Sequence, residues 1–261
     1  GQEFSTYAVM LGEDEARLAE AAQLVREINL GATAIGTGIN AHPEYAQRVT
    51  RLLSDISAVD FVVSPNLIEA TQDAGAFVQL SGVLKRVAVK LSKVCNDLRL
   101  LSSGPRAGLG EINLPAVQAG SSIMPGKVNP VIPEVVNQVA FEVIGNDITV
   151  TMAAEGGQLQ LNAFEPVIAH SLFKSLSHLS NACRVLAERC VRGITANRER
   201  ARELLDSSTA LVTALNPYIG YARSSELAKE ALRTGRRVYD LVLEKKLLEA
   251  SQDQGEAVVA A

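Results

Sequence analysis

The sequence lacks several features that mark whole classes of proteins. It has no Trp, and aromatic residues make up only 4% of its 261 residues. Its longest run of basic residues is the pair Arg236 and Arg237, and its formal net charge is −4. This charge pattern argues against nucleic acid or an anionic membrane surface as a partner. No apolar run approaches the roughly 18 residues that a membrane-spanning helix needs, so we expect no membrane insertion.

Cysteine is scarce as well. The three cysteines are an odd number in a long chain, which argues against a disulfide framework and for a reducing compartment. The first residues carry acidic side chains such as Glu3 and Glu13, whereas a secretory signal peptide begins with basic residues. We therefore expect a cytoplasmic protein.

Aliphatic residues dominate what is present. Apolar residues make up 47% of the chain and charged residues 21%, so the chain can bury a sizeable core and is not a disordered tail. The length corresponds to one large domain, or to one domain with a small appendage. Small aliphatic side chains with few aromatic residues favour helix-on-helix packing.

Apolar residues recur at steps of three and four in several stretches, which is the pattern of helices that pack against each other. The longest stretch runs without interruption from Phe77 to Leu101. Others begin at Leu18 and end at a predicted glycine stop, Gly31, or cover residues 172–190, where the cysteines are predicted to be core residues.

A further helix is predicted from residue 130 onward, with apolar residues at positions 136, 139 and 143. Four long helices with this spacing predict an all-α fold, a long-helix bundle over residues 1–197. Short amphipathic pieces follow, and we predict a small C-terminal helical domain over residues 198–261.

The segment GSSIMPGKVNP at residues 120–130 is the strongest candidate for a functional site. It is a loop with glycines at both ends, and it leads into a helix whose predicted N-cap is Asn129, with Pro130 at the first helical position. Free backbone N–H groups and the positive end of the helix dipole make such a start a carboxylate or phosphate site. Lys127 adds a positive charge. The alternative is an ordinary polar loop before a helix.

Other ligand classes fit the sequence poorly. The 120–130 segment has five residues between its glycines and Val128 after Lys127, whereas a phosphate-binding P-loop needs four residues and then Ser or Thr. Residues 36–41 match the dinucleotide pattern G-x-G-x-x-A, but no alternation of strands and helices surrounds them. The histidines and cysteines do not have metal-ligand spacing. We therefore expect neither a metal nor a cofactor.

The same segment resembles the signature of the fumarase/aspartase superfamily, homotetrameric lyases that release fumarate from a succinyl-type substrate. The sequence VIPEVVNQVAFEVIGND at residues 131–147 resembles the aspartate ammonia-lyases within it. Residues 34–40, 98–115 and 215–221 also fit the superfamily. The resemblance covers essentially the whole chain. It implies the central helical bundle and the C-terminal domain of that fold, and L-aspartate and fumarate as the small-molecule ligands.

The resemblance also implies roles for individual residues. Ser121 is similar to the serine that acts as general base and removes the C3 proton of L-aspartate. Lys127 and Asn129 match residues that hold a substrate carboxylate, and Ser122 belongs to the same substrate-binding loop. Glu134 corresponds to a supporting glutamate that pairs with a histidine in relatives.

Several interpretations of the function remain open within this resemblance. The superfamily's N-terminal domain and first central helix have no counterpart here, so we expect a C-terminal fragment that is inactive or nearly so on its own. Fumarate hydratase is the alternative activity, followed by lyases that cleave argininosuccinate or adenylosuccinate. A different kind of alternative is a non-catalytic module that only forms the core of a tetramer.

Overall fold

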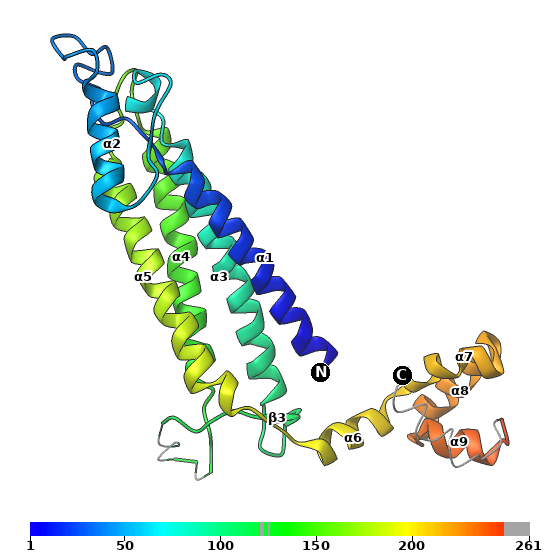
Figure 1. Cartoon of the computed structure of the whole chain (residues 1–261). Helices are drawn as coiled ribbons and strands as arrows, with labels where there is room; N and C mark the ends of the chain where they lie inside the picture. The colour runs from blue at the N-terminus through cyan, green and yellow to red at the C-terminus, as the bar shows by residue number, and fades with distance from the viewer. Residues whose placement is uncertain (119, 121–122, 125, 248–261) are drawn as a thin grey trace. The chain divides into compact units, whose positions relative to one another are not determined.

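The computed structural model describes residues 1–118, 120, 123–124 and 126–247 and divides the chain into two compact units (Figure 1). The first unit contains Gly1–Ser103 and Leu114–Ile194. The second contains Gly104–Asn113 and the residues from Thr195 onward. The domain division after residue 197 stays a prediction. The compact units are not continuous in sequence, because residues 104–113 belong to the second unit although they lie within the range of the first.

Long helices build the first unit, which confirms the predicted all-α class. Helix α3 (Gly75–Leu101) lies beside α1 (Gln2–Leu24), α4 (Val131–Glu155) and α5 (Glu165–Arg189), and it contacts each of them (Figure 1). The helices and strands of this unit are α1 (Gln2–Leu24), β1 (Glu27–Ile28), α2 (Tyr45–Ser57), β2 (Val62–Val63), η1 (Glu69–Thr71), α3 (Gly75–Leu101), α4 (Val131–Glu155), α5 (Glu165–Arg189) and η2 (Val191–Gly193).

Helix α3 is the centre of the first unit. It coincides with the predicted stretch, and its apolar residues from Leu84 to Leu98 at steps of three and four are buried. Leu98 is only 1% exposed, whereas Phe77 at the start of the stretch is 37% exposed. The middle and end of the predicted stretch therefore supply the core.

Helix α5 buries a different stripe from the one that its sequence predicts. Leu172, Leu179 and Leu186 are buried as expected, but Leu176 and Cys183 are exposed. Small residues, Ser175 and Ala182, occupy the buried positions between the leucines. The prediction that Cys183 is a core residue is therefore wrong. One residue is a rotation of 100° on a helix, so the neighbouring small residues face the core instead.

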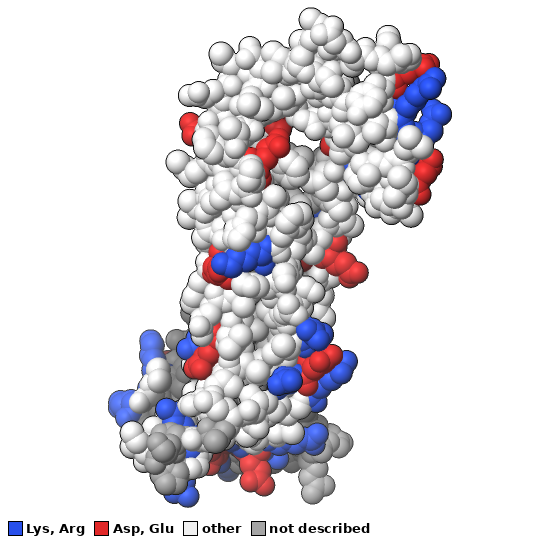
Figure 2. All heavy atoms as spheres, turned by 90° about the vertical axis from the view of Figure 1, so that its left-hand side faces the viewer, with Lys and Arg blue, Asp and Glu red and all other residues white. Residues whose placement is uncertain are grey.

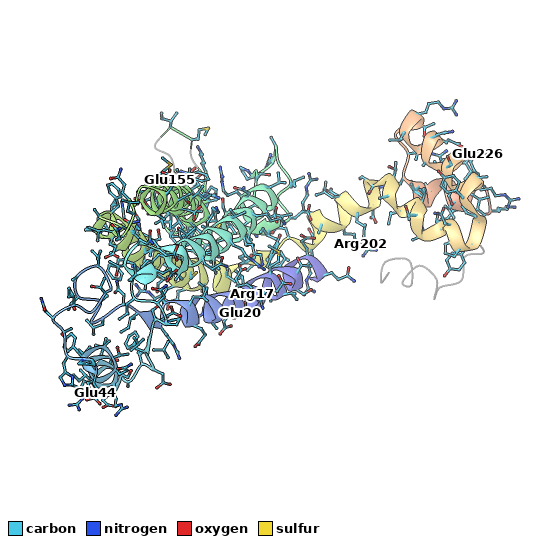
Figure 3. The ribbon with its side chains drawn as sticks, turned by 90° about the horizontal axis from the view of Figure 1, so that it is seen from above. Arg17, Glu20, Glu44, Glu155, Arg202 and Glu226 are labelled. Carbon is cyan, nitrogen blue, oxygen red and sulfur yellow. The ribbon has the colours of Figure 1, made fainter. Side chains whose placement is uncertain are left out.

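Helix α1 ends earlier than predicted, at Leu24 rather than before Gly31. Glu27 and Ile28 leave the helix and pair in parallel with Val62 and Val63. The backbone N–H of Val62 donates to the carbonyl of Arg26, so this carbonyl is satisfied by the strand. On the outer surface of the helix, Arg17 and Glu20 form an ion pair at 2.6 Å (Figure 3).

The second unit consists of short helices around its own core. Its elements are β3 (Ile112–Asn113), β4 (Thr195–Ala196), α6 (Arg198–Ser207), η3 (Thr209–Leu211), α7 (Val212–Ile219), α8 (Tyr221–Thr234) and α9 (Val238–Glu244). β3 pairs antiparallel with β4, which joins residues 104–113 to this unit. The core consists of Leu215, Ile219, Leu227, Ala231, Val238, Leu241 and Val242. Within the described part of the chain, no helix combines the length and apolarity needed to cross a membrane.

Candidate active site

The described backbone of residues 120–130 folds back on itself. A Cβ atom added to Gly120 would lie 2.6 Å from the carbonyl oxygen of Lys127, so only glycine allows this close approach. Gly126 has a φ of +80°, a left-handed conformation that glycine adopts at no steric cost. The N–H of Lys127 donates to the carbonyl of Met124 at 3.3 Å. The two glycines therefore have the conformational roles that a tight ligand-binding loop requires.

Helix α4 begins one residue later than the sequence predicts. Pro130 is its N-cap, with a ψ of 54°, and Val131 is its first residue. The N–H of Val131 donates to the carbonyl of Asn129 at 2.9 Å. Asn129 is therefore not the N-cap, and within the described residues no side chain caps the helix. Its amide stays available for another partner.

Three polar side chains at this helix start are half-buried: Lys127, Asn129 and Glu134. Their ammonium, amide and carboxylate groups make no hydrogen bond or ion pair with any residue that the structure describes. Half-buried polar groups usually have partners, because desolvation without a partner costs free energy. The arrangement therefore suits a ligand that supplies the partners.

The structure brings these three predicted residues together at one end of α4. Ser121 and Ser122 lie outside the described residues, and their predicted roles stay predictions. An ammonium group beside the N-terminus of a 25-residue helix creates positive potential. This end of α4 can hold a carboxylate and stabilise negative charge that develops on it.

A polar network that the sequence analysis missed lies beside the first turns of α4. Asn137 is 3% exposed, and its amide nitrogen donates to the hydroxyl of Ser92 at 2.8 Å. The same nitrogen also donates to the side-chain oxygen of Asn96, and Arg99 donates to the Asn137 oxygen. The signal in the sequence was an amide that directly follows the apolar residues Val135 and Val136. Its partners lie about forty residues earlier and could not be read from a local pattern.

The cysteines and histidines do not offer a competing reactive centre. Burial raises the pKa of the Cys95 thiol to about 12, so the thiol stays protonated at neutral pH. His42 accepts a backbone hydrogen bond from Glu44, and His178 pairs with Glu142 at 2.7 Å. These contacts agree with structural roles for the two histidines.

A shallow cavity of about 200 Å³ lies on the second unit. Its charged lining contains two basic and two acidic side chains, and one pair, Lys245 and Glu230, forms an ion pair at 2.7 Å. Glu226, labelled in Figure 3, is the other acid. Because these charges balance, the cavity lacks the net positive potential that an anion needs, and the start of α4 remains the better anion site.

The sequence is similar to those of known lyases. A lyase family model matches residues 1–145, and a model described as the fumarase C C-terminus matches residues 211–254. An aspartate ammonia-lyase from Helicobacter pylori is 62% identical over 252 residues, which cover 97% of this chain and 54% of the relative. An aspartate ammonia-lyase from Escherichia coli is 55% identical over 248 residues, which cover 95% of this chain and 52% of the relative. The chain thus spans about half the length of the curated relatives it matches.

Solved structures give the same result at the level of the fold. The crystal structure of fumarate lyase:delta crystallin from Brucella melitensis bound to cobalt superposes with a TM-score of 0.92 at 60% identity, covering 97% of this chain and 55% of that one. A class II fumarase from Schistosoma mansoni superposes with a TM-score of 0.89 at 36% identity, covering 95% and 55%. Since the lyase family model covers more than half of the 261 residues, the chain belongs to this lyase family, as the resemblance of residues 120–130 predicts.

Proposed function

We propose that this protein is an aspartate ammonia-lyase, which eliminates ammonia from L-aspartate to release fumarate. The observation that carries the proposal is the set of polar groups of Lys127, Asn129 and Glu134 at the start of α4, which have no partner among the residues that the structure describes. Relatives named aspartate ammonia-lyase, at 55–62% identity, support the choice of substrate.

The proposed chemistry explains why an anion site is needed. Removing the C3 proton of aspartate leaves a carbanion whose charge spreads onto the adjacent carboxylate. Lys127 and the helix start supply fixed positive potential where this charge develops. Asn129 donates hydrogen bonds to the same carboxylate.

In this proposal Ser121 takes the proton from C3. The electron pair of the broken C–H bond forms the double bond, and ammonia leaves from C2. A neutral hydroxyl is a poor base, so Ser121 acts as its alkoxide, stabilised by N–H groups of the loop. Exclusion of water from the bound substrate strengthens both effects, and Ser122 belongs to the same substrate-binding loop. Glu134 supports the site from the first turn of α4.

The proposal includes a homotetramer. Helices α4 and α5 expose large apolar side chains on their outer faces: Phe141, Ile148, Met152 and Phe173 are 62–71% exposed. Figure 2 shows a face of the first unit on which charged side chains are few over much of its length. Apolar surface of this kind is typical of protein interfaces, and subunits of the same chain are the partners that we infer. A monomer in sedimentation at micromolar concentration would contradict this part.

We also infer a cytoplasmic location, because three unpaired cysteines suit a reducing compartment.

The test of the activity is fumarate release by the full product of the gene, followed by the ultraviolet absorbance of fumarate. L-aspartate is expected to be converted, and D-aspartate and L-malate serve as controls. Faster conversion of L-malate than of L-aspartate would replace the proposal by fumarate hydratase, which the match to the fumarase C C-terminus makes the natural second candidate. Absence of any fumarate from either substrate would favour a non-catalytic role in assembly.

A further inference from the structure

Two separate groups of buried polar side chains join α3 and α4. Near the beginning of α3, the hydroxyl of Ser81 donates to the carboxylate of Asp147 at 2.8 Å. Lys85 pairs with the same carboxylate at 2.5 Å. The second group surrounds Asn137, which lies opposite Ser92. These two pairings show that the helices run antiparallel, so the start of α4 is level with the end of α3.

Asn137 has hydrogen-bond partners at both ends of its side-chain amide in this interface. Its amide nitrogen donates to the carbonyl oxygen of Ser92 at 3.1 Å, to the Ser92 hydroxyl at 2.8 Å and to Asn96 at 3.1 Å. Its oxygen accepts from Arg99 at 3.2 Å. An amide offers two N–H donors and one acceptor oxygen, so both ends of the side chain are satisfied. A slide of α4 by one residue would leave this buried amide without partners.

The directional character of these bonds matters because the side chains around Asn137 in the interface are mostly apolar. Buried side chains such as Leu98, Val136 and Ala140 exclude water but tolerate small shifts of one helix along the other. Helix α4 also has no capping side chain at its start among the described residues. Asn137 is therefore the directional contact with α3 that lies nearest to the anion site. A single buried asparagine can determine the register of packed helices in this way.

We propose that Asn137 is a positioning residue for the anion site. By fixing the register of α4 on α3, it determines where the helix start, Lys127 and Glu134 lie relative to the substrate. Glu134 is one turn before Asn137, and a helix moves as a rigid body over two turns. The activity readout of this inference rests on the proposed function, whereas the structural readout does not.

The test compares Asn137→Leu with Ser81→Ala in the full product of the gene. Leucine has the same number of side-chain heavy atoms and the same branching at Cγ, although it is larger, and it cannot form the hydrogen bonds. Ser81 provides a matched polar contact at the distant end of the same interface. We expect Asn137→Leu to lower kcat/KM for L-aspartate by about 10- to 100-fold, because small misplacements of binding groups cost rate. Ser81→Ala should stay within about twofold of the wild type. Circular dichroism identifies a temperature at which each variant is fully folded, and the kinetics are measured at that temperature. If Asn137 only stabilises the fold, kcat/KM of the variant should then equal that of the wild type.

A second variant and a second measurement keep the inference testable in every case. Arg99→Met removes the donor to the Asn137 oxygen at a partly exposed position, and should lower kcat/KM in the same direction but less. Hydrogen exchange measures local opening of the helix start without activity: the hydrogen-bonded amides of residues 134–136 should exchange at least about tenfold faster in Asn137→Leu and at the wild-type rate in Ser81→Ala.

The outcomes separate the two proposals. A wild type that releases no fumarate overturns the proposed function, and the exchange measurement then decides the role of Asn137 alone. A folded Asn137→Leu variant with wild-type exchange in residues 134–136 overturns the positioning role. So does an equal loss in Ser81→Ala, because it would show that any polar contact in the interface matters as much.

Discussion

The interface between α3 and α4 and the segment 120–130 use the same kinds of residue in opposite ways. In the interface, Leu98 and Val136 are each 1% exposed. In the segment, Ile123 is 87% exposed and Val128 is 54% exposed. Buried apolar side chains stabilise the fold, whereas the segment contributes a glycine-rich backbone and polar groups to a site. Substitutions of buried apolar side chains in the interface should therefore lower stability and spare the chemistry, and substitutions in the segment should do the reverse.

Ser121→Ala has the largest expected effect. It tests whether a substitution in segment 120–130 changes the chemistry without changing stability. Removing the proposed base should lower kcat by about 10²- to 10⁴-fold, with KM nearly unchanged, because the carboxylate contacts remain. Steady-state kinetics on the full product of the gene measures both constants, and the midpoint of thermal unfolding should not move. A kcat within a few-fold of the wild type would mean that Ser121 is not the base.

Leu98→Ala tests the interface. Loss of a fully buried leucine leaves a cavity and should cost about 2–5 kcal/mol of unfolding free energy. Leu100, two residues later on the same helix, is 59% exposed, and Leu100→Ala should cost about 0.5 kcal/mol or less. Urea unfolding at one fixed protein concentration compares the two, since assembly would make apparent stability depend on concentration. Equal losses would contradict the burial that the structure assigns to Leu98.

Lys127→Ala should change binding more than stability. It removes a charge-assisted contact to the substrate carboxylate that exists before and during the reaction, so KM should rise by about tenfold or more. Lys229→Ala, at an exposed lysine of the second unit, is the control for a general loss of charge. If both KM and kcat are unchanged in Lys127→Ala, Lys127 does not bind the substrate and the segment is an ordinary polar loop before a helix.

The smallest expected effect concerns an ion-pair cluster between α4 and α5. A hydrogen bond from Lys174, and a second contact with His178, lower the pKa of Glu142. A carboxyl with a lowered folded pKa stabilises the fold above its ordinary pKa, and this contribution disappears as pH falls through the lowered value. Because the group is 36% exposed, solvent screening limits the effect to about 0.5 kcal/mol.

Glu142→Gln should therefore unfold at a slightly lower temperature than the wild type at pH 7, and this difference should shrink as the pH falls below the ordinary pKa range of a glutamate. Glu188→Gln, at an exposed position of α5, is the matched control and should show no difference at pH 7 or at acid pH. A larger difference at acid pH than at pH 7 would reverse the sign and refute the lowered pKa.

Much of the fold could be predicted from local patterns, and the errors share one cause. The stretch from Phe77 to Leu101 coincides with α3 because its apolar spacing is that of a helix face. In α5, however, Leu176 and Cys183 face outward although they continue a similar spacing. A step of 3.5 residues drifts relative to the 3.6-residue turn, so the choice between adjacent faces depends on the neighbouring helix.

The site divides in the same manner. The glycines and Lys127 of the segment could be identified from the sequence, because turn conformation and charge are local properties. The network of Asn137 with Ser92, Asn96 and Arg99 could not, since its members lie 38–45 residues apart. No local pattern states which residues become neighbours when two helices pack.

By itself, the sequence determined that this chain forms long helices and carries a lyase motif before one of them. Helical periodicity and turn chemistry depend on residues that are close in the sequence, so they can be predicted from the order of the residues. Only the tertiary structure decided that Asn137 is level with Ser92, that Lys127, Asn129 and Glu134 share one end of α4 without protein partners among the described residues, and that Phe141 faces outward. These facts depend on the rotation and axial register of each helix, which result from the sum of contacts across the interface.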